Sequence, residues 1–208
     1  MKRGRLFVIA APSGAGKTSL VKALLQQEPG LHLSVSHTTR AQRPNEADGR
    51  EYHFVNVAAF RELIARGEFL EHAQVFDNLY GTSRVFVEQR LDAGQDVVLE
   101  IDWQGAQQVR RALPTCVSVF ILPPSQAALA QRLASRGTDS AQVIERRLRD
   151  AAADMSHYAE FDYVVVNDDF AHAVSDLRRI VAGNAADLSS RRPGLAPLLA
   201  ELLAPAKR

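Results

Sequence analysis

The stretch "APSGAGKT", residues 11–18, contains residue types that together bind a phosphate chain. Gly14 and Gly16 can adopt positive φ, so successive backbone N–H groups can turn inward toward phosphate oxygens. Lys17 can reach β- and γ-phosphates, the Thr18 hydroxyl can ligate Mg²⁺, and the following helix adds its positive N-terminal end. The expected phosphate-binding residues are Ala11, Pro12, Ser13, Gly14, Ala15, Gly16, Lys17 and Thr18.

This loop departs from the pattern G-x-x-x-x-G-K-[ST] at its first position, where Ala11 replaces glycine. A damaged site, a chance string and a working site without that glycine are the three explanations. The string G-x-G-K-[ST] is expected by chance in under about 1% of chains this long, and here it lies between a buried strand and a helix. We therefore expect a working site, in which the Ala11 methyl group is tolerated as long as its φ stays negative.

A P-loop needs an acidic group on a neighbouring strand to hold the water shell of its metal. "VVLEIDWQG" offers Glu100 and Asp102, which share one face of a strand because side chains alternate. Asp102 lies nearer the carboxyl end and is the better candidate for contacting Mg²⁺, through water. The alternative for either carboxylate is a helix cap or a salt bridge.

The segment "SHTTRAQRPNEADGREYHF" suggests a second phosphate site. Arg40, Arg43 and Tyr52, with Tyr80 and Thr82 of "NLYGTS", are the residue types that bind a phosphorylated acceptor. The alternative is a solvated basic loop, and the residues alone leave both open. Glu71 could accept N1–H and N2–H of guanine, whereas adenine presents an acceptor at N1.

Arginines also crowd a charged helical segment between residues 132 and 157. Arg132 and Arg136 would repel each other on one helix face, and Arg146, Arg147 and Arg149 lie close together. A polyanion arriving between the helices would relieve this repulsion, as in a closing lid. Asp139, Glu145 and Asp150 could instead pair with these arginines on an ordinary solvated face. Asp139 or Ser140 is the expected N-cap of the second helix.

The elements that position these residues follow from four apolar runs without polar alternation, which is typical of strands buried on both faces. Helix-like stretches between the runs predict a parallel sheet covered by helices, with ligands at the carboxyl ends of the strands. Strands are expected at residues 5–11, 95–102, 118–123 and 163–168. Helices are expected at 17–27, 57–66, 83–93, 104–112, 126–135 and 171–188, and a short apolar helix after the turn in the tail 191–208.

Composition excludes several other classes of protein. The chain has 208 residues, 46% of them hydrophobic, and a formal net charge of +1, which argues against a nucleic-acid binder. Cys116 is the single cysteine and is expected to be a buried structural thiol in a reducing compartment. No signal peptide, membrane span or metal-binding histidine spacing is expected, so a cytoplasmic protein without a membrane partner is predicted. A homo-oligomer is left open.

The motifs occur in an order that resembles guanylate kinase of the bacterial type. They are "APSGAGKT", "SVSHTTRAQRPNE", "FLEHAQVFDNLYGTS", "LEIDWQGAQQV", "FILPPS", "RLASRGTD" and "VNDDF", and they run from about Leu6 to the helix after Asn167. The resemblance implies an α/β fold of the P-loop NTPase type. It has a three-layer core with a parallel sheet, an inserted α+β GMP-binding subdomain and a helical lid. The implied segments are 1–35 (core with P-loop), 36–86 (GMP-binding subdomain), 87–129 (core), 130–160 (lid) and 161–208 (core and C-terminal helices).

The resemblance also implies roles for single residues. Ser36, Arg40, Arg43, Tyr52 and Tyr80 would bind the GMP phosphate, and Glu71 and Thr82 would bind guanine. The family often has Asp where this chain has the longer Glu100, and the resemblance implies that this carboxylate also contacts guanine. Asn167 would lie beside the adenine of ATP. The implied catalytic residues are Lys17, Arg40, Arg43, Arg136 and Arg147.

The expected reaction is the transfer of a phosphoryl group from ATP to GMP, with Mg²⁺ as the cofactor, dGMP as a second acceptor, and no general base. Two alternatives stand beside it. One is a non-catalytic, guanylate-kinase-like module that binds proteins, which would be expected to have lost P-loop residues. The other is a related kinase for a different phosphorylated acceptor, such as a ribose bisphosphate. Glu71, Tyr80 and Thr82 favour an acceptor with a base.

Overall fold

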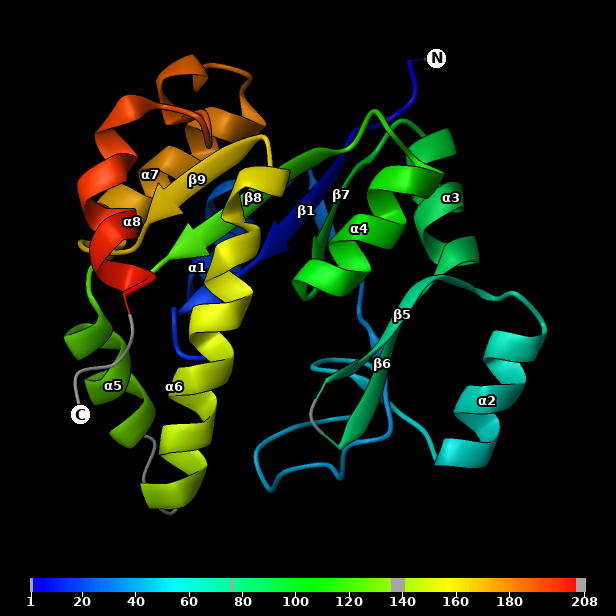
Figure 1. Cartoon of the computed structure of the whole chain (residues 1–208). Coiled ribbons are helices and arrows are strands. Elements are labelled where there is room, and N and C mark those ends of the chain that lie inside the picture. The colour runs from blue at the N-terminus through cyan, green and yellow to red at the C-terminus, as the bar shows by residue number, and fades with distance from the viewer. Residues whose placement is uncertain (1, 76, 136–140, 205–208) are drawn as a thin grey trace. The chain divides into compact units, whose positions relative to one another are not determined.

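The computed structural model describes residues 2–75, 77–135 and 141–204. Within this part of the chain, a five-stranded parallel sheet has the order β2-β7-β1-β8-β9 (Figure 1). Its strands are β1 (Leu6–Ala10), β2 (Leu31–Leu33), β7 (Asp96–Glu100), β8 (Val117–Leu122) and β9 (Tyr163–Val166). All five residues of β1 are buried, as its unbroken apolar sequence predicts. The predicted α/β fold with a parallel sheet is confirmed; the short β2 was not predicted.

Contacts divide the chain into two compact units. The first contains Met1–Val8 and Pro29–Val117, and the second contains Ile9–Glu28 and Ser118–Arg208. Strand β1 is therefore shared, and β2 and β7 belong to the first unit. Strand β9 and all of β8 except Val117 belong to the second.

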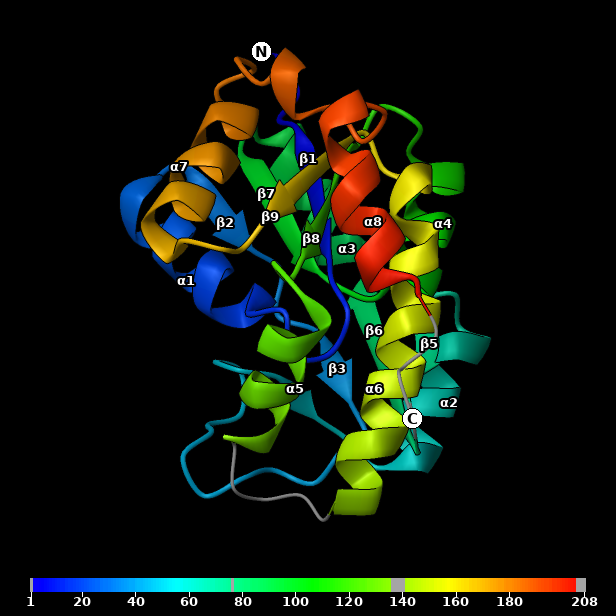
Figure 2. The same ribbon diagram turned by 60° about the vertical axis from the view of Figure 1, so that its left-hand side comes forward.

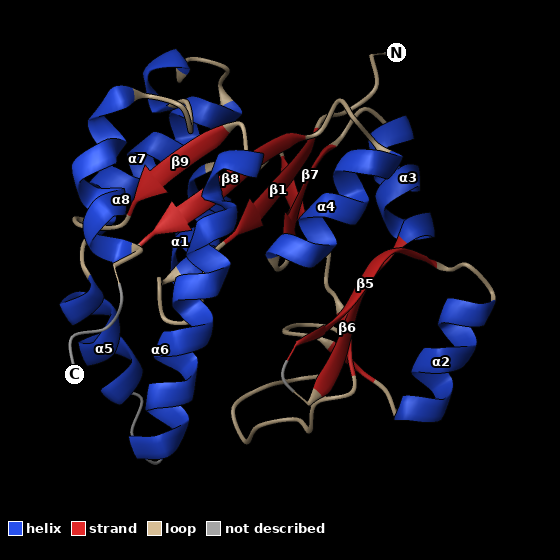
Figure 3. Cartoon of the chain, viewed as in Figure 1, coloured by secondary structure: helices blue, strands red, loops and turns tan. Residues whose placement is uncertain are grey.

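The first unit contains a second sheet, with the order β4-β3-β6-β5 (Figure 3). Its strands are β3 (His37–Thr38), β4 (His53–Phe54), β5 (Phe69–Val75) and β6 (Asn78–Ser83). Helix α2 (Val57–Ala65) begins after Asn56, whose side chain accepts the Ala59 N–H. Phe60 and Phe69 are buried, with ring centroids 4.7 Å apart. This sheet and helix lie inside the predicted segment 36–86. The strand-like stretches "EYHFV" and "FLEHAQVF" predicted β4 and β5, whereas β3 and β6 were not predicted.

Two further helices of the first unit begin at side-chain caps. Ser83 caps α3 (Arg84–Asp92) by accepting the Phe86 N–H, and Asp102 caps α4 (Trp103–Ala112) by accepting the Gly105 N–H. Both helices bury an apolar stripe, which includes Val87 and Leu91 on α3. The cap at Asp102 places the start of α4 directly after β7.

The second unit contains α1 (Lys17–Gln27), α5 (Gln126–Ala134), α6 (Ala141–Met155), α7 (Phe170–Val181) and α8 (Ala196–Leu202). It also contains 3-10 turns at Ser156–Glu160, Ala186–Leu188 and Pro193–Leu195. Figure 2 shows α1 and α7 side by side, and Arg178 Nε lies 2.7 Å from Glu28 Oε1 at the end of α1. Helix α1 has its predicted bounds.

The predicted helix over residues 171–188 is too long. Helix α7 ends at Val181 because Gly183 has a φ of 78° and the Gly183 N–H turns back to the Ile180 carbonyl, which closes the helix. Leu188 lies instead in a separate 3-10 turn.

The tail after residue 191 packs as part of the second unit. Leu195, Leu199 and Leu202 are buried. The Gln126 side-chain amide donates to the carbonyls of Glu201, Leu202 and Ala204 at and just after the end of α8. The predicted short apolar helix in the tail is confirmed.

Candidate active site

The P-loop connects β1 to α1 in the second unit. Gly14 has a φ of 91° and Gly16 a φ of 93°, in the left-handed region that favours glycine. The Ala15 N–H donates to the Pro12 carbonyl at 3.2 Å, which closes a tight turn, and Gly16 is the N-cap of α1. A Cβ on Gly14 would lie 2.9 Å from Leu133 Cδ2, so this glycine also allows close packing against α5. Lys17 and Thr18 occupy the first turn of α1, at the positive end of the helix dipole, which favours an anion.

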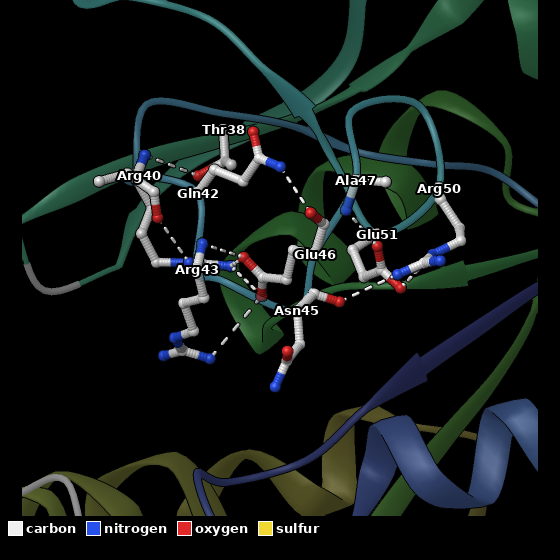
Figure 4. Close-up of polar contacts among 10 residues, drawn as sticks. Thr38, Arg40, Gln42, Arg43, Asn45, Glu46, Ala47, Arg50 and Glu51 are labelled. Atoms are coloured by element: carbon white, nitrogen blue, oxygen red, sulfur yellow. Dashed lines mark hydrogen bonds and ion pairs between the residues drawn. The ribbon is translucent and has the colours of Figure 1, made fainter.

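Two arginines of the first unit share one carboxylate (Figure 4). Arg40 Nη2 lies 2.7 and 2.9 Å from the two oxygens of Glu46, and the Arg43 backbone N–H donates to Glu46 Oε2 at 2.9 Å. The hydrogen bond from Arg40 lowers the pKa of the Glu46 carboxyl, so it is ionised at neutral pH. Glu46 therefore fixes the guanidinium of Arg40, whereas the Arg43 side chain is 64% exposed.

Aromatic rings surround Arg40. Its guanidinium carbon lies 5.3 Å from the Tyr52 ring centroid, and the rings of Tyr52 and Tyr80 are 5.8 Å apart. Burial, with a smaller contribution from the Glu100 charge, raises the pKa of Tyr52 to about 12. Tyr52 is therefore protonated at neutral pH and can donate a hydrogen bond to an anion. Ser36 is buried one residue before β3.

A buried carboxylate lies between β5 and the start of α4. Glu71 is 3% exposed, and the Thr82 hydroxyl donates to Glu71 Oε1 at 2.5 Å. The two residues are partners across β5 and β6, after a register shift between Phe69 and Glu71. On the other side, a Cβ on Gly105 would overlap Glu71 Oε2. The absence of a side chain at Gly105 thus lets the first turn of α4 approach the carboxylate.

Asp102 acts as a helix cap in this structure, which is one of the alternatives that its sequence position left open. Its Oδ1 accepts the Gly105 N–H at 2.8 Å, and its Oδ2 accepts the Gln104 side-chain amide at 3.2 Å. No group of three or more His, Cys, Asp or Glu residues suited to a metal ion occurs in the part of the chain that the structure describes.

A family model described as guanylate kinase matches residues 3–184. The chain belongs to the guanylate kinase family. The guanylate kinase of Chromohalobacter salexigens is 58% identical over 97% of this chain and 94% of its own length. That of Methylococcus capsulatus is 57% identical over 98% of this chain and 100% of its own length. The crystal structure of guanylate kinase from Anaplasma phagocytophilum aligns with a TM-score of 0.75 at 34% identity, covering 96% of this chain and 95% of that chain. The resemblance inferred from the motifs is confirmed.

The predicted lid arginines of this guanylate kinase family member are described only in part. Arg136 and the expected N-cap residues Asp139 and Ser140 lie outside the described residues. Arg147 is half-buried on α6, and Arg146 lies 3.8 Å from Asp150 on the same helix. In the described part of the chain, no helix has both the length and the apolar character needed to cross a membrane.

The structure of this guanylate kinase family member also shows contacts that the motifs did not predict. Glu46 holds Arg40, and Gly105 makes room for Glu71. Asn167, predicted beside adenine, is buried at the end of β9, and its side-chain amide donates to the Ala15 carbonyl of the P-loop at 2.7 Å. Asn167 was thus predicted at the site but not in this contact. Of the other two, Glu46 had a sequence signal, since it follows Arg43 by three residues in a turn-forming stretch, and Gly105 had none.

Proposed function

We propose that this chain transfers the γ-phosphoryl group of ATP to GMP, giving ADP and GDP, and that it accepts dGMP as well. The buried Glu71 carboxylate carries the assignment of the acceptor, because membership of the guanylate kinase family predicts a guanine-reading group at this position. The intact P-loop supports ATP as the donor.

Guanine recognition is assigned to Glu71 and Thr82. A carboxylate is an acceptor only, so it matches the N1–H and N2–H donors of guanine and opposes the N1 acceptor of adenine. The Thr82 hydroxyl, bonded to Glu71 Oε1, holds the carboxylate in one orientation. Glu100, whose charge acts on Tyr52, is proposed as a further contact with the base.

A substitution at Gly105 should disturb this pocket without touching GMP directly. Gly105→Ala is expected to raise KM for GMP at least tenfold, because the new methyl group would displace Glu71 Oε2. Helix propensity alone would predict a gain in stability from this change. Gly30→Ala is the matched control, since a Cβ on Gly30 meets no atom within 4 Å. KM for GMP is measured by steady-state kinetics at varied GMP concentration. A parental KM in Gly105→Ala as well as in Gly30→Ala would contradict the proposal.

The acceptor phosphate is assigned to Ser36, Arg40, Arg43, Tyr52 and Tyr80. Arg40 is held in place by Glu46, and Tyr52 keeps its proton at neutral pH, so both present donors to an anion. GMP needs no general base, because the second pKa of a phosphate monoester is about 6 and the attacking oxygen is already ionised. One of its oxygens forms a bond to the γ-phosphorus while the bond from that phosphorus to the β,γ-bridging oxygen of ATP breaks.

Charge neutralisation is therefore the main catalytic task. Lys17, Arg40, Arg43, Arg136 and Arg147 are proposed for it. Mg²⁺, when bound with ATP, would neutralise part of the phosphate charge. The hard oxygen donors of Thr18 and Asp102 suit this ion, with Asp102 acting through water. Asn167 is proposed to lie near adenine.

The P-loop assignment predicts a large loss of activity from a substitution at Gly16 and a small change from one at Ala11. Gly16→Ala is expected to lower kcat/KM for ATP more than tenfold, because alanine is strained at a φ of 93° and its Cβ would lie 2.5 Å from Asn167 Nδ2. Ala11→Gly is expected to change kcat/KM less than twofold, since Ala11 directly follows β1. The reverse order of these two effects would show that the loop works differently.

A coupled assay of ADP release tests the function directly. With ATP and Mg²⁺, turnover is expected with GMP and dGMP and should be far weaker with AMP, UMP or a ribose bisphosphate. Turnover that favours the ribose bisphosphate would support the related kinase. No turnover with any acceptor would support the protein-binding module, which the retained Gly14, Gly16, Lys17 and Thr18 argue against. A cytoplasmic location is proposed as well, since a reducing compartment suits a chain whose one cysteine, Cys116, is buried.

A further inference from the structure

A side chain at the end of β9 holds the P-loop in place within the second unit. Asn167 is 5% exposed, and its Nδ2 donates to the carbonyl oxygen of Ala15 at 2.7 Å. The backbone of Asn167 is itself fixed, because its N–H donates to the Leu122 carbonyl at 2.8 Å and its carbonyl accepts Arg132 Nη2 at 2.9 Å. The amide of Asn167 is therefore a donor attached to the sheet, and not to the loop that it holds.

The Ala15 carbonyl determines where the next N–H group points. The described peptide bonds are all trans, and in a trans peptide the C=O and the following N–H point in opposite directions. With the Ala15 oxygen directed at Asn167, the N–H of Gly16 is directed away from it. In a P-loop, the N–H groups of these glycine-rich positions are donors to the phosphates of the nucleotide.

Gly16 has no side chain, and this leaves space for the amide of Asn167 beside it. A Cβ on Gly16 would lie 2.5 Å from Asn167 Nδ2, closer than real Cβ atoms approach other heavy atoms. Only glycine at this position leaves room for the hydrogen bond between Asn167 and Ala15. The close contact and the hydrogen bond are two observations of one packing arrangement.

We propose that Asn167 is a positioning residue for phosphoryl transfer, whose side-chain amide holds the Ala15 carbonyl so that the Gly16 N–H is preset toward the phosphates of ATP. This inference rests on the proposed role of the P-loop. It is a separate role from a contact with adenine, because it depends on the one N–H of Nδ2 that donates to Ala15. The substrate feature that depends on this hydrogen bond is therefore the polyphosphate chain, not the base.

The test uses a ligand that has the phosphates but lacks the base. Dissociation constants for ATP, inorganic tripolyphosphate and GMP are measured separately by calorimetry on the full chain, for Asn167→Ala, Asn167→Asp and the control Asn184→Ala. Asn184 is an exposed asparagine after α7. Asn167→Asp keeps the size and shape of the side chain but, when ionised, has no donor. Both Asn167 variants should bind ATP and tripolyphosphate about tenfold more weakly, by the same factor, while GMP binding stays unchanged.

Each other outcome contradicts the proposal. If ATP binding weakened and tripolyphosphate binding did not, the amide would act on adenine. If all three ligands lost the same factor in both variants, Asn167 would support the fold in general. If the Asn167 variants bound all three ligands as tightly as Asn184→Ala does, the hydrogen bond would not contribute to nucleotide binding. If the unmodified chain bound neither ATP nor tripolyphosphate, the P-loop assignment itself would fail, together with this inference.

Discussion

Replacing Lys17 by alanine is expected to lower kcat by about 10²–10³-fold, because the ammonium group would no longer stabilise charge on the transferring phosphoryl group. Lys17 begins α1, immediately after the left-handed Gly16, so its backbone is positioned by the loop and not by its own side chain. The substitution should therefore leave the fold intact. Single-turnover measurements with saturating GMP would separate the chemical step from binding.

A matched control for this experiment lies on the same helix. Lys22→Ala removes an exposed lysine of α1 and should keep kcat within about twofold of the parent, since exposed surface substitutions have small effects. Near-normal turnover of Lys17→Ala would contradict the role assigned to the P-loop. Equal losses in the two variants would point to a general effect of charge.

The second large effect is expected at Glu71. Glu71→Gln keeps the size of the side chain but places an amide donor against the N–H donors of guanine, so kcat/KM for GMP should fall by about 10²-fold or more. The Thr82 hydroxyl can still donate to the amide oxygen, so the hydrogen bond inside the pocket can survive. KM for ATP should stay unchanged, because Glu71 is assigned to the acceptor alone.

Glu62→Gln provides the comparison, as Glu62 is an exposed carboxylate of α2 whose side chain is 62% exposed. It should leave the kinetics of both substrates unaltered. Initial rates with GMP and ATP varied independently give the two KM values. A Glu71→Gln enzyme with the parental kcat/KM for GMP would show that the base is read elsewhere.

Local patterns predicted much of this fold because they depend on neighbours in the sequence. The glycine-rich loop followed by Lys17 predicted where α1 begins, and the apolar runs predicted β1, β7, β8 and β9. The patterns were less successful where a short element depends on a partner. Strand β2 is only Leu31–Leu33 and is defined by its pairing with β7. The end of α7 depended on one glycine, Gly183, inside a sequence that is otherwise compatible with a helix.

The candidate site divides in the same way. Residue types and spacing predicted the P-loop and the arginines, since the chemistry of phosphate binding limits which side chains can serve. The prediction that Glu71 binds guanine rested on the resemblance to guanylate kinase. Residue types and spacing did not show that Glu46 pairs with Arg40, because that contact depends on the conformation of the loop that carries both residues. They also did not show that Gly105 borders Glu71, because that contact depends on how separate segments pack. Arg136, predicted from the family motif, lies outside the described residues and keeps its role as a prediction.

By itself, the sequence determined the kind of chemistry: a phosphate-binding loop, an acceptor site rich in arginine and tyrosine, and an α/β fold around them. Only the tertiary structure decided what holds these parts in their working geometry. The hydrogen bond from Asn167 to Ala15 joins residues 152 positions apart. Such a contact has no local sequence pattern, because it exists only once β1 and β9 are built into one sheet and bring the two residues together.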